Sequence, residues 1–238
     1  MITLHDFAPR GAGGPYTFSL ATGQVLGLID GDGEEARIFL EAVAGSVRHR
    51  GRVAVGARLR TPRDIAYAPD EPEQILFGRK GRDALRGVRA VEALGALEGE
   101  FLLERDFLQL SSGERRRLAL AAVLGSGRRL LLFDRPTAGL DPAGQRQFWN
   151  ALRSMGATAI VAALDEAEAL RCDLVLALPG EGAPHAVSTP LPMALTRRAG
   201  WPPSPLAQVA AALHGEEGKD IHSLREEVEA RCAQRHQE

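Results

Sequence analysis

Short apolar runs alternate with helical patterns along the first 180 residues. Runs rich in Val, Ile and Leu occupy residues 25–29, 53–55, 65–68, 130–133, 160–164 and 174–178. Strands that are apolar on both faces are typical of a sheet covered by helices on both sides. The pattern therefore predicts an α/β fold with a buried sheet.

Three helices are predicted between these runs, over residues 34–44, 114–124 and 142–155. Gly45 and Gly125 follow the first two and are suited to end them. Asp141 is the expected N-cap of the third, and Pro142 fits its first turn. These signals place a helix after each of three predicted strands or turns.

The amino-acid composition of the sequence changes after about residue 187. Five prolines punctuate the next stretch, at positions 190, 192, 202, 203 and 205, before two short amphipathic helices. In the second helix Leu224, Val228 and Cys232 form a narrow apolar stripe, which either docks on the protein's own core or meets a partner. We interpret residues 1–187 as one α/β domain and residues 188–238 as a helical C-terminal extension.

Composition and charge exclude several classes of protein. Hydrophobic residues make up 45% of the 238 positions, enough for a substantial core. Lys and Arg number 29 and Asp and Glu 31, so the net charge of −2 lacks the basic excess of a nucleic-acid-binding chain. The longest apolar run, residues 118–124, is far too short to span a bilayer.

Cysteine usage and the N-terminal segment favour a reducing cytoplasm. Cys172 and Cys232 are the two cysteines, and two do not build a disulfide framework or a metal knuckle. The first thirty residues lack the basic start and apolar block of a secretory signal. We therefore expect a cytoplasmic protein.

Two segments carry a recognisable series of motifs. The first reads Leu110-Ser111-Ser112-Gly113-Glu114, and the second runs from Leu130 through Asp134-Arg135-Pro136-Thr137-Ala138-Gly139-Leu140-Asp141. In order and spacing they resemble the signature loop, the Walker B strand and the D-loop of ATP-binding-cassette (ABC) ATPases. The resemblance implies a P-loop NTPase-like nucleotide-binding domain with a helical subdomain at about residues 71–125, shorter than is usual, and a role in transport.

A finer likeness concerns one subfamily. Residues 71–77, Glu-Pro-Glu-Gln-Ile-Leu-Phe, are similar to the segment after the Q-loop in the ATPases of energy-coupling-factor importers. Ser188-Thr189-Pro190 and Trp201-Pro202-Pro203 look like the C-terminal extension of the same subfamily, which is involved in dimer contacts. The resemblance thus points to vitamin or metal import.

The phosphate-binding loop departs from the family pattern. Gly31 and Gly33 keep the frame, but Ala36 stands where a lysine reaches the phosphates, and Arg37 and Ile38 stand where hydroxyls bind Mg²⁺. Residues 30–37 carry a net charge of −3. A carboxylate about 6 Å from a phosphate costs roughly 3 kcal/mol at an effective dielectric of 20, more than the ~1 kcal/mol that a helix N-terminus offers an anion. We expect this site to be empty or structural, although acidic residues there also suit the helix dipole.

Compared with the family that it resembles, the sequence departs from the pattern at three further positions. Arg135 occupies the position of the catalytic glutamate and cannot accept a proton. Asp70 aligns with the Q-loop glutamine, with Gln74 as the alternative if the loop is shifted. The switch histidine position falls on Ala163 or Leu164, and no histidine occurs between residues 49 and 185. The Walker B Asp134 remains as a weak Mg²⁺ ligand.

The signature segment and the D-loop keep the residues of the family pattern. In the family, ATP lies between the P-loop of one subunit and the signature loop of the other. Ser111, Ser112, Gly113 and Glu114 supply hydroxyls, a backbone N–H and a helix N-terminus for a partner's ATP, and Asp141 belongs to a loop that crosses the dimer interface. The alternative is that Ser111 and Glu114 form an ordinary capping box.

Two smaller expectations concern side chains near these motifs. Arg115, Arg116 and Arg117 form a basic cluster, and we expect them to be solvated rather than to bind a ligand. Phe7 and Tyr16 are candidates for stacking on adenine, but core packing is the stronger interpretation.

Three functions follow from this pattern. The leading hypothesis is a catalytically degenerate ABC subunit that pairs with an intact ABC ATPase and shares ATP and Mg²⁺ with it at one composite site. Under this hypothesis the pair serves an importer at the inner face of the cell membrane, and a transmembrane coupling protein is a further candidate partner. The second is an ABC-like scaffold or regulatory module without ATPase activity. The third is a self-sufficient ATPase, which demands unusual chemistry from Asp134 and Arg135.

Overall fold

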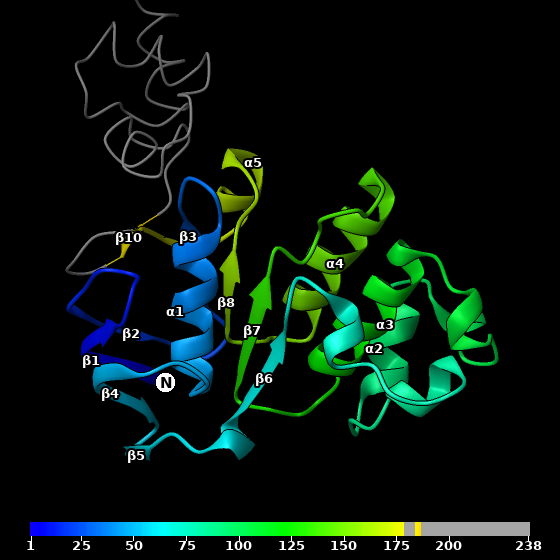
Figure 1. Cartoon of the computed structure of the whole chain (residues 1–238), viewed down its shortest axis with the longest axis horizontal. Helices are drawn as coiled ribbons and strands as arrows, with labels where there is room; N and C mark the ends of the chain where they lie inside the picture. Colours follow the sequence, from blue (N-terminus) through cyan, green and yellow to red (C-terminus); the bar gives the residue numbers. More distant parts are fainter. Residues whose placement is uncertain (179–183, 187–238) are drawn as a thin grey trace, which may run out of the picture.

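The computed structural model describes residues 1–178 and 184–186, and its centre is a six-stranded sheet (Figure 1). The strands follow the order β10-β9-β3-β8-β7-β6. Their bounds are β3 Val25–Ile29, β6 Ile65–Ala68, β7 Leu130–Asp134, β8 Ala159–Ala162, β9 Leu174–Ala177 and β10 His185–Ala186. All neighbours pair in parallel except β9 and β10. The predicted α/β fold is confirmed.

A second sheet is antiparallel and has the order β2-β1-β4-β5. Its strands are β1 Ile2–Pro9, β2 Tyr16–Leu20, β4 His49–Val55 and β5 Arg58–Leu59. Of these, the sequence pattern predicted only residues 53–55. The remaining strands bury one face alone, so their apolar residues alternate with polar ones and form no continuous run.

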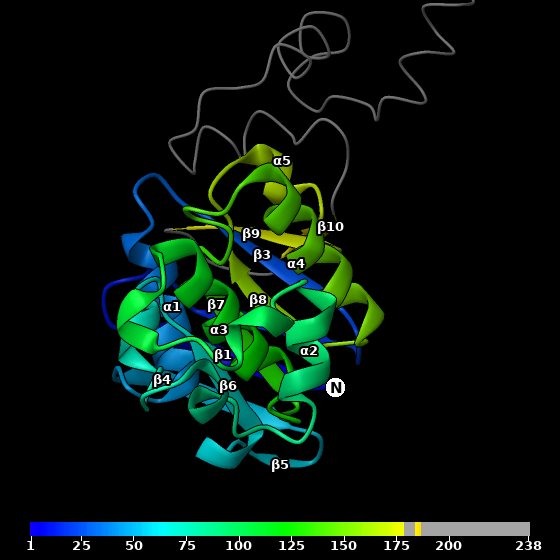
Figure 2. The same cartoon turned by 90° about the vertical axis from the view of Figure 1, so that its right-hand side faces the viewer.

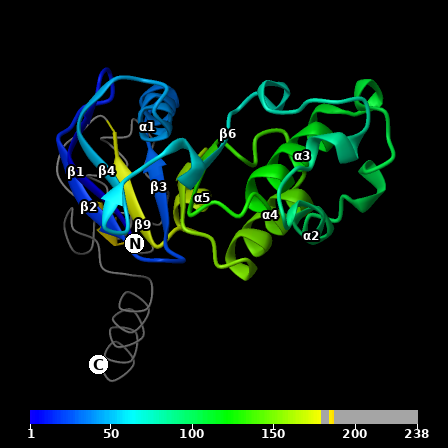
Figure 3. The ribbon, with the colours of Figure 1, turned by 90° about the horizontal axis from the view of Figure 1, so that it is seen from below.

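Five α-helices lie among the strands: α1 Glu34–Ala44, α2 Ala90–Ala96, α3 Ser112–Leu124, α4 Pro142–Ser154 and α5 Glu166–Ala169. Short 3₁₀ segments cover Pro62–Asp64, Pro72–Gln74, Gly81–Ala84, Glu100–Leu102 and Phe107–Gln109. Helix α1 lies beside the antiparallel sheet, whereas α2, α3 and α4 gather at the opposite end of the molecule (Figures 1 and 3). In the view from the side on which α2, α3 and α4 lie, these helices stand in front of the central sheet (Figure 2).

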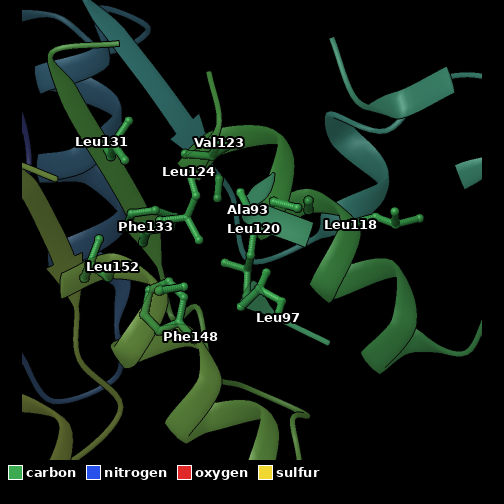
Figure 4. Close-up of a cluster of buried hydrophobic side chains, with 14 of the residues drawn as sticks. Ala93, Leu97, Leu118, Leu120, Val123, Leu124, Leu131, Phe133, Phe148 and Leu152 are labelled. Atoms are coloured by element: carbon green, nitrogen blue, oxygen red, sulfur yellow. The ribbon is translucent and has the colours of Figure 1, made fainter. Parts of the chain in front are cut away.

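The core is divided between the two faces of the central sheet. On one face Phe39 of α1 meets Phe7 and Tyr16 of the antiparallel sheet edge to face, with ring centroids 5.3 and 5.4 Å away. On the other face, Phe133 and Phe148 are 5.2 Å apart among buried leucines of α3 and α4 (Figure 4). These packed faces hold the ends of β3 and β7, where the motifs lie.

The predicted helices agree with the structure to within two residues at their ends. Helix α1 has the predicted bounds and ends at Gly45, whose φ of +99° is in the left-handed region that favours glycine. The strand predicted over 160–164 is wrong at its end, because β8 stops at Ala162 and leaves Ala163 and Leu164 beyond it. The C-terminal extension, with its proline-rich stretch, its two helices and Cys232, lies outside the described residues. Within residues 1–178 and 184–186, no helix has the length and apolarity needed to cross a bilayer.

Candidate functional site

The loop between β3 and α1 uses its own carboxylates to cap the helix. Oδ2 of Asp30 accepts a hydrogen bond from the backbone N–H of Ala36 at 2.9 Å, and Oδ1 of Asp32 accepts one from the N–H of Glu34 at 2.9 Å. The free N–H groups of a first helical turn are the donors that would otherwise bind an anion. Two of these donors are already satisfied by the chain itself.

The same loop concentrates negative charge. Oxygen atoms of Asp30, Asp32 and Glu35 lie within 4.8 Å of one another, and burial raises the pKa of Asp30. Ala36, at the lysine position, is fully buried, and Arg37 turns away to pair with Glu41 at 3.2 Å. Gly31 and Gly33 therefore frame a loop that has no lysine and that gathers three carboxylates.

Arg135 lies across this loop. Gly33 has a φ of +84°, and a side chain built on it would come within 3.6 Å of Cδ of Arg135. The Arg135 guanidinium forms an ion pair with Asp70, which joins the end of β7 to the segment after β6. Arg135 itself has a φ of +45°, an uncommon conformation for a residue with a side chain, and so stores backbone strain. Asp70 thus lies beside the loop and is bound by an arginine.

Arg116 completes this ion-pair cluster. Its guanidinium donates to Oδ1 of Asp70 at 3.2 Å and to the backbone carbonyl of Arg135 at 3.3 Å. Gln74, the alternative Q-loop position, is exposed and hydrogen-bonds to Glu71 at 3.0 Å. Of the two candidates, only Asp70 reaches the cluster.

The expectation that residues 115–117 are merely solvated is wrong. Arg115 pairs with Glu73 at 2.7 Å and donates to the carbonyl of Leu110 at 3.0 Å. Arg117 donates to the carbonyl of Leu97 at 2.8 Å. Because α3 packs against the segments before and after it, these side chains tie the helical part together instead of facing water.

Asp134 is buried at the end of β7 with an incomplete set of partners. The Tyr67 hydroxyl reaches its Oδ2 at 3.5 Å, whereas its Oδ1 has no hydrogen bond and lies 3.9 Å from Nε of Arg135. Burial, with a smaller contribution from Asp70, raises its pKa to about 6 despite the opposing effect of Arg135. Mg²⁺ requires several oxygen ligands, and the free oxygen here faces a guanidinium, so Asp134 alone does not form a magnesium site.

Glu168 is a buried acid that the sequence analysis missed. Its Oε2 accepts the backbone N–H of Leu164 at 2.9 Å, and the Thr137 hydroxyl donates to its Oε1. It therefore ties the segment after β8, with Ala163 and Leu164, to the loop before α4. The capping pair Asp165 and Glu168 at the start of α5 is the signal that could have located it.

The signature segment opens α3 beside a hollow of about 580 Å³. The Ser111 hydroxyl accepts the N–H of Glu114 at 3.3 Å, and the Glu114 carboxylate accepts the N–H of Ser111 at 2.8 Å. The capping box, which the sequence analysis gave as the alternative to a ligand-binding role, is therefore present. The N–H groups of Ser112 and Gly113 have no hydrogen bond within the described residues. Both residues line the hollow, so their two N–H donors lie at the end of α3 that borders it.

The D-loop residues line the same hollow. Asp141 caps α4 by accepting the N–H of Gly144 at 2.8 Å and lies 3.5 Å from a guanidinium nitrogen of Arg117. Its side chain stays 64% exposed, so one end of the hollow is open to a neighbouring molecule. The hollow thus brings Ser111, Ser112 and Gly113 together with Asp141, and neither Gly31 nor Gly33 lines it.

Phe7 and Tyr16 are fully buried in the core, which confirms packing as their role. The Tyr16 hydroxyl donates to the carbonyl of Ala12 at 2.7 Å. Neither ring is offered to adenine.

Comparison with known proteins establishes the class of protein. No family profile matches the chain. An ABC transporter ATP-binding protein of Gloeobacter violaceus is 33% identical over 188 residues, which cover 68% of this chain and 77% of that protein. A solved ATP-binding cassette, a dimer in a post-hydrolysis state with ADP and Pi, has a TM-score of 0.64 at 18% identity and covers 76% of this chain and 96% of its own. The fold is that of an ABC ATPase domain.

The chain belongs to the ABC transporter ATP-binding proteins. It is also similar to an energy-coupling-factor transporter ATP-binding protein of Bacillus subtilis, with 39% identity over 88 residues that cover 37% of this chain and 30% of that protein. The predicted family is therefore confirmed.

Proposed function

We propose that this chain is the non-hydrolysing member of a pair of ABC ATPase subunits. It pairs with a chain that has an intact P-loop and supplies the signature loop and the D-loop to that chain's ATP. Ser112 and Gly113 donate backbone hydrogen bonds to the partner's nucleotide, and Asp141 lies at the contact between the two subunits. Mg²⁺ then belongs to the partner's half of the site.

One observation supports this proposal above the others. Among the described residues, the N–H groups of Ser112 and Gly113, the first two of the signature helix, have no hydrogen bond and lie beside a hollow. At α1 the N–H of the first residue, Glu34, binds Asp32, and the N–H of the third, Ala36, binds Asp30. The chain therefore keeps an anion-binding helix terminus on the face that a partner would use and neutralises the one that would bind its own nucleotide.

The finer assignments follow from the same proposal. The likeness to energy-coupling-factor ATPases supports an importer of that type, with the chain on the inner face of the membrane beside a transmembrane coupling protein. Residues 1–187 form the ATPase-like domain, about 71–125 its helical subdomain, and 188–238 an extension involved in pairing. A homodimer would contain no intact P-loop, so the partner is a different chain.

Binding of MgATP to the isolated chain tests the loop directly. We expect no saturation up to about 1 mM in calorimetric titrations, because two first-turn donors of α1 are occupied and no lysine offsets the carboxylates. Asp30→Asn removes one charge and keeps an acceptor for Ala36, so it should strengthen binding about tenfold. Glu92→Gln, which removes a charge distant from the loop, is the control. Micromolar binding by the unmodified chain would refute an empty site.

Hydrolysis by the assembled pair separates the proposal from a scaffold function. We expect the genes beside that of this chain to encode the candidate partner, an intact ABC ATPase, together with a transmembrane coupling protein. Mixing that ATPase with this chain should raise its MgATP hydrolysis above that of either chain alone. A complex whose turnover equals that of the ATPase by itself would favour the scaffold, and turnover by this chain alone would establish a self-sufficient ATPase.

A further inference from the structure

A basic hollow lies where the end of β1 pairs with the start of β4, and no residue of the nucleotide motifs lines it. It has a volume of about 430 Å³ and is lined by Ala8, Pro9, Arg10, Arg48, His49 and Arg50. The register pairs Ala8 with Arg50, and the N–H of Arg10 donates to the carbonyl of Arg48 at 3.1 Å. Two neighbouring strand ends thus place three guanidinium groups around one hollow.

These arginines point away from α1 and the P-loop. Phe7 and His49, whose ring centroids are 4.9 Å apart, lie on the inner face where Phe39 of α1 packs. Side chains alternate between the two faces of a strand, so Arg48 and Arg50 project from the opposite face. Arg10, Arg48 and Arg50 are all exposed. The hollow is therefore separate from the nucleotide-binding loop.

The three guanidinium groups have no protein partner within the described part of the chain. None of them forms an ion pair or a side-chain hydrogen bond there, and no Asp or Glu lines the hollow. The arginines of α3, by contrast, all have carboxylate or carbonyl partners. Three unpaired arginines gathered without a carboxylate are an arrangement that an anionic ligand would stabilise.

We propose that this hollow binds a diphosphate group. Guanidinium groups bind phosphate oxygens in pairs of parallel hydrogen bonds, and three of them balance the charge of about −3 that a diphosphate carries near neutral pH. The volume suits a small ligand, and no Phe, Tyr or Trp lines the hollow. The site therefore recognises the phosphates, whether they are free or part of a lipid headgroup.

Titration of the full-length chain with inorganic pyrophosphate tests this proposal. We expect saturable binding at 0.15 M salt, weakened about tenfold by Arg48→Gln or Arg50→Gln and abolished by the double variant. Arg146→Gln is the matched control, because Arg146 is an exposed residue of α4 outside this hollow and the substitution removes the same charge. Because all of these side chains are exposed, thermal unfolding midpoints should stay unchanged.

Flotation with vesicles distinguishes the two sources of phosphate. Binding to vesicles that contain a lipid with a diphosphate headgroup, such as diacylglycerol diphosphate, but not to phosphatidylcholine vesicles, would assign the site to a membrane headgroup if Arg48→Gln and Arg50→Gln abolish it. Pyrophosphate binding without vesicle binding would assign it to a free ligand. The proposal is overturned if neither probe binds, or if Arg146→Gln weakens binding as much as Arg48→Gln does. The assay needs neither ATP nor a partner, so its outcome is independent of the proposed ATPase pairing.

Discussion

Gly113→Asp in this chain is expected to lower the MgATP turnover of the assembled pair by about 100-fold. The new carboxylate would stand at the helix terminus that we propose faces the partner's nucleotide. At about 6 Å from a phosphate charge and an effective dielectric of 20, the repulsion is roughly 3 kcal/mol, which corresponds to that factor. Steady-state phosphate release by the reconstituted pair measures the effect.

The substitution leaves the fold of this chain intact. A side chain at position 113 would meet no atom closer than the carbonyl oxygen of Gly139, at 3.5 Å. An acidic residue in a first helical turn also interacts favourably with the helix dipole. Any loss of turnover therefore originates in the contact with the partner and not in unfolding.

Val91→Asp provides the matched control. Val91 is 54% exposed at the second position of α2, the same helical position that Gly113 has in α3. The variant adds an identical charge to a helix terminus outside the signature hollow. Turnover that is equally high in both variants would contradict the assignment of the signature loop to the partner's nucleotide.

Asp134→Asn is expected to stabilise the protein above pH 6. The carboxylate is buried and one of its oxygens has no hydrogen bond. Burial raises its pKa from 3.8 to about 6. A group whose pKa is raised on folding stabilises the folded state fully below pH 3.8 and loses that contribution as the pH rises through 6.

The size of the effect follows from the same two values. At about 1.4 kcal/mol for each pH unit between 3.8 and about 6, the free energy of unfolding should differ by up to about 3 kcal/mol at pH 8. Near pH 4 the variant and the unmodified protein should be almost equally stable. Urea unfolding at both pH values, with a chelator to remove Mg²⁺, measures the difference.

A surface carboxylate gives the comparison for this experiment. Glu98→Gln changes an exposed residue and should leave the pH dependence of unfolding unaltered. If Asp134→Asn were destabilising at pH 8, the buried carboxylate would instead be held by Arg135 strongly enough to outweigh its burial.

The order of the motifs and the buried strands could be read from the sequence because each depends on local pattern. Residues 25–29 and 130–133 form continuous apolar runs, since both faces of these strands are covered. Strands β1 and β2 were not predicted, because only one face of each is buried and their apolar residues form no continuous run. The end of β8 was misplaced because Ala163 and Leu164 are as apolar as the strand that precedes them.

The partners of charged residues could not be read from the sequence. Asp70 and Arg135 lie 65 positions apart, and only the parallel pairing of β6 with β7 brings them together. The buried state of Glu168 depends in the same way on packing against the loop that contains Thr137. Such contacts join distant segments, and no spacing along the chain encodes them.

By itself, the sequence determined the family, the α/β architecture, the residues at each motif position and the surplus of acid in the loop before α1. Only the tertiary structure decided where those charges are directed. Asp30 and Asp32 accept hydrogen bonds from first-turn amides of α1. Arg10, Arg48 and Arg50 share one hollow because strand pairing aligns them on one face of a sheet. Composition and spacing are properties of the sequence alone. The electrostatic field at a site is the sum of contributions from charges on several segments, and these segments meet only in the folded chain.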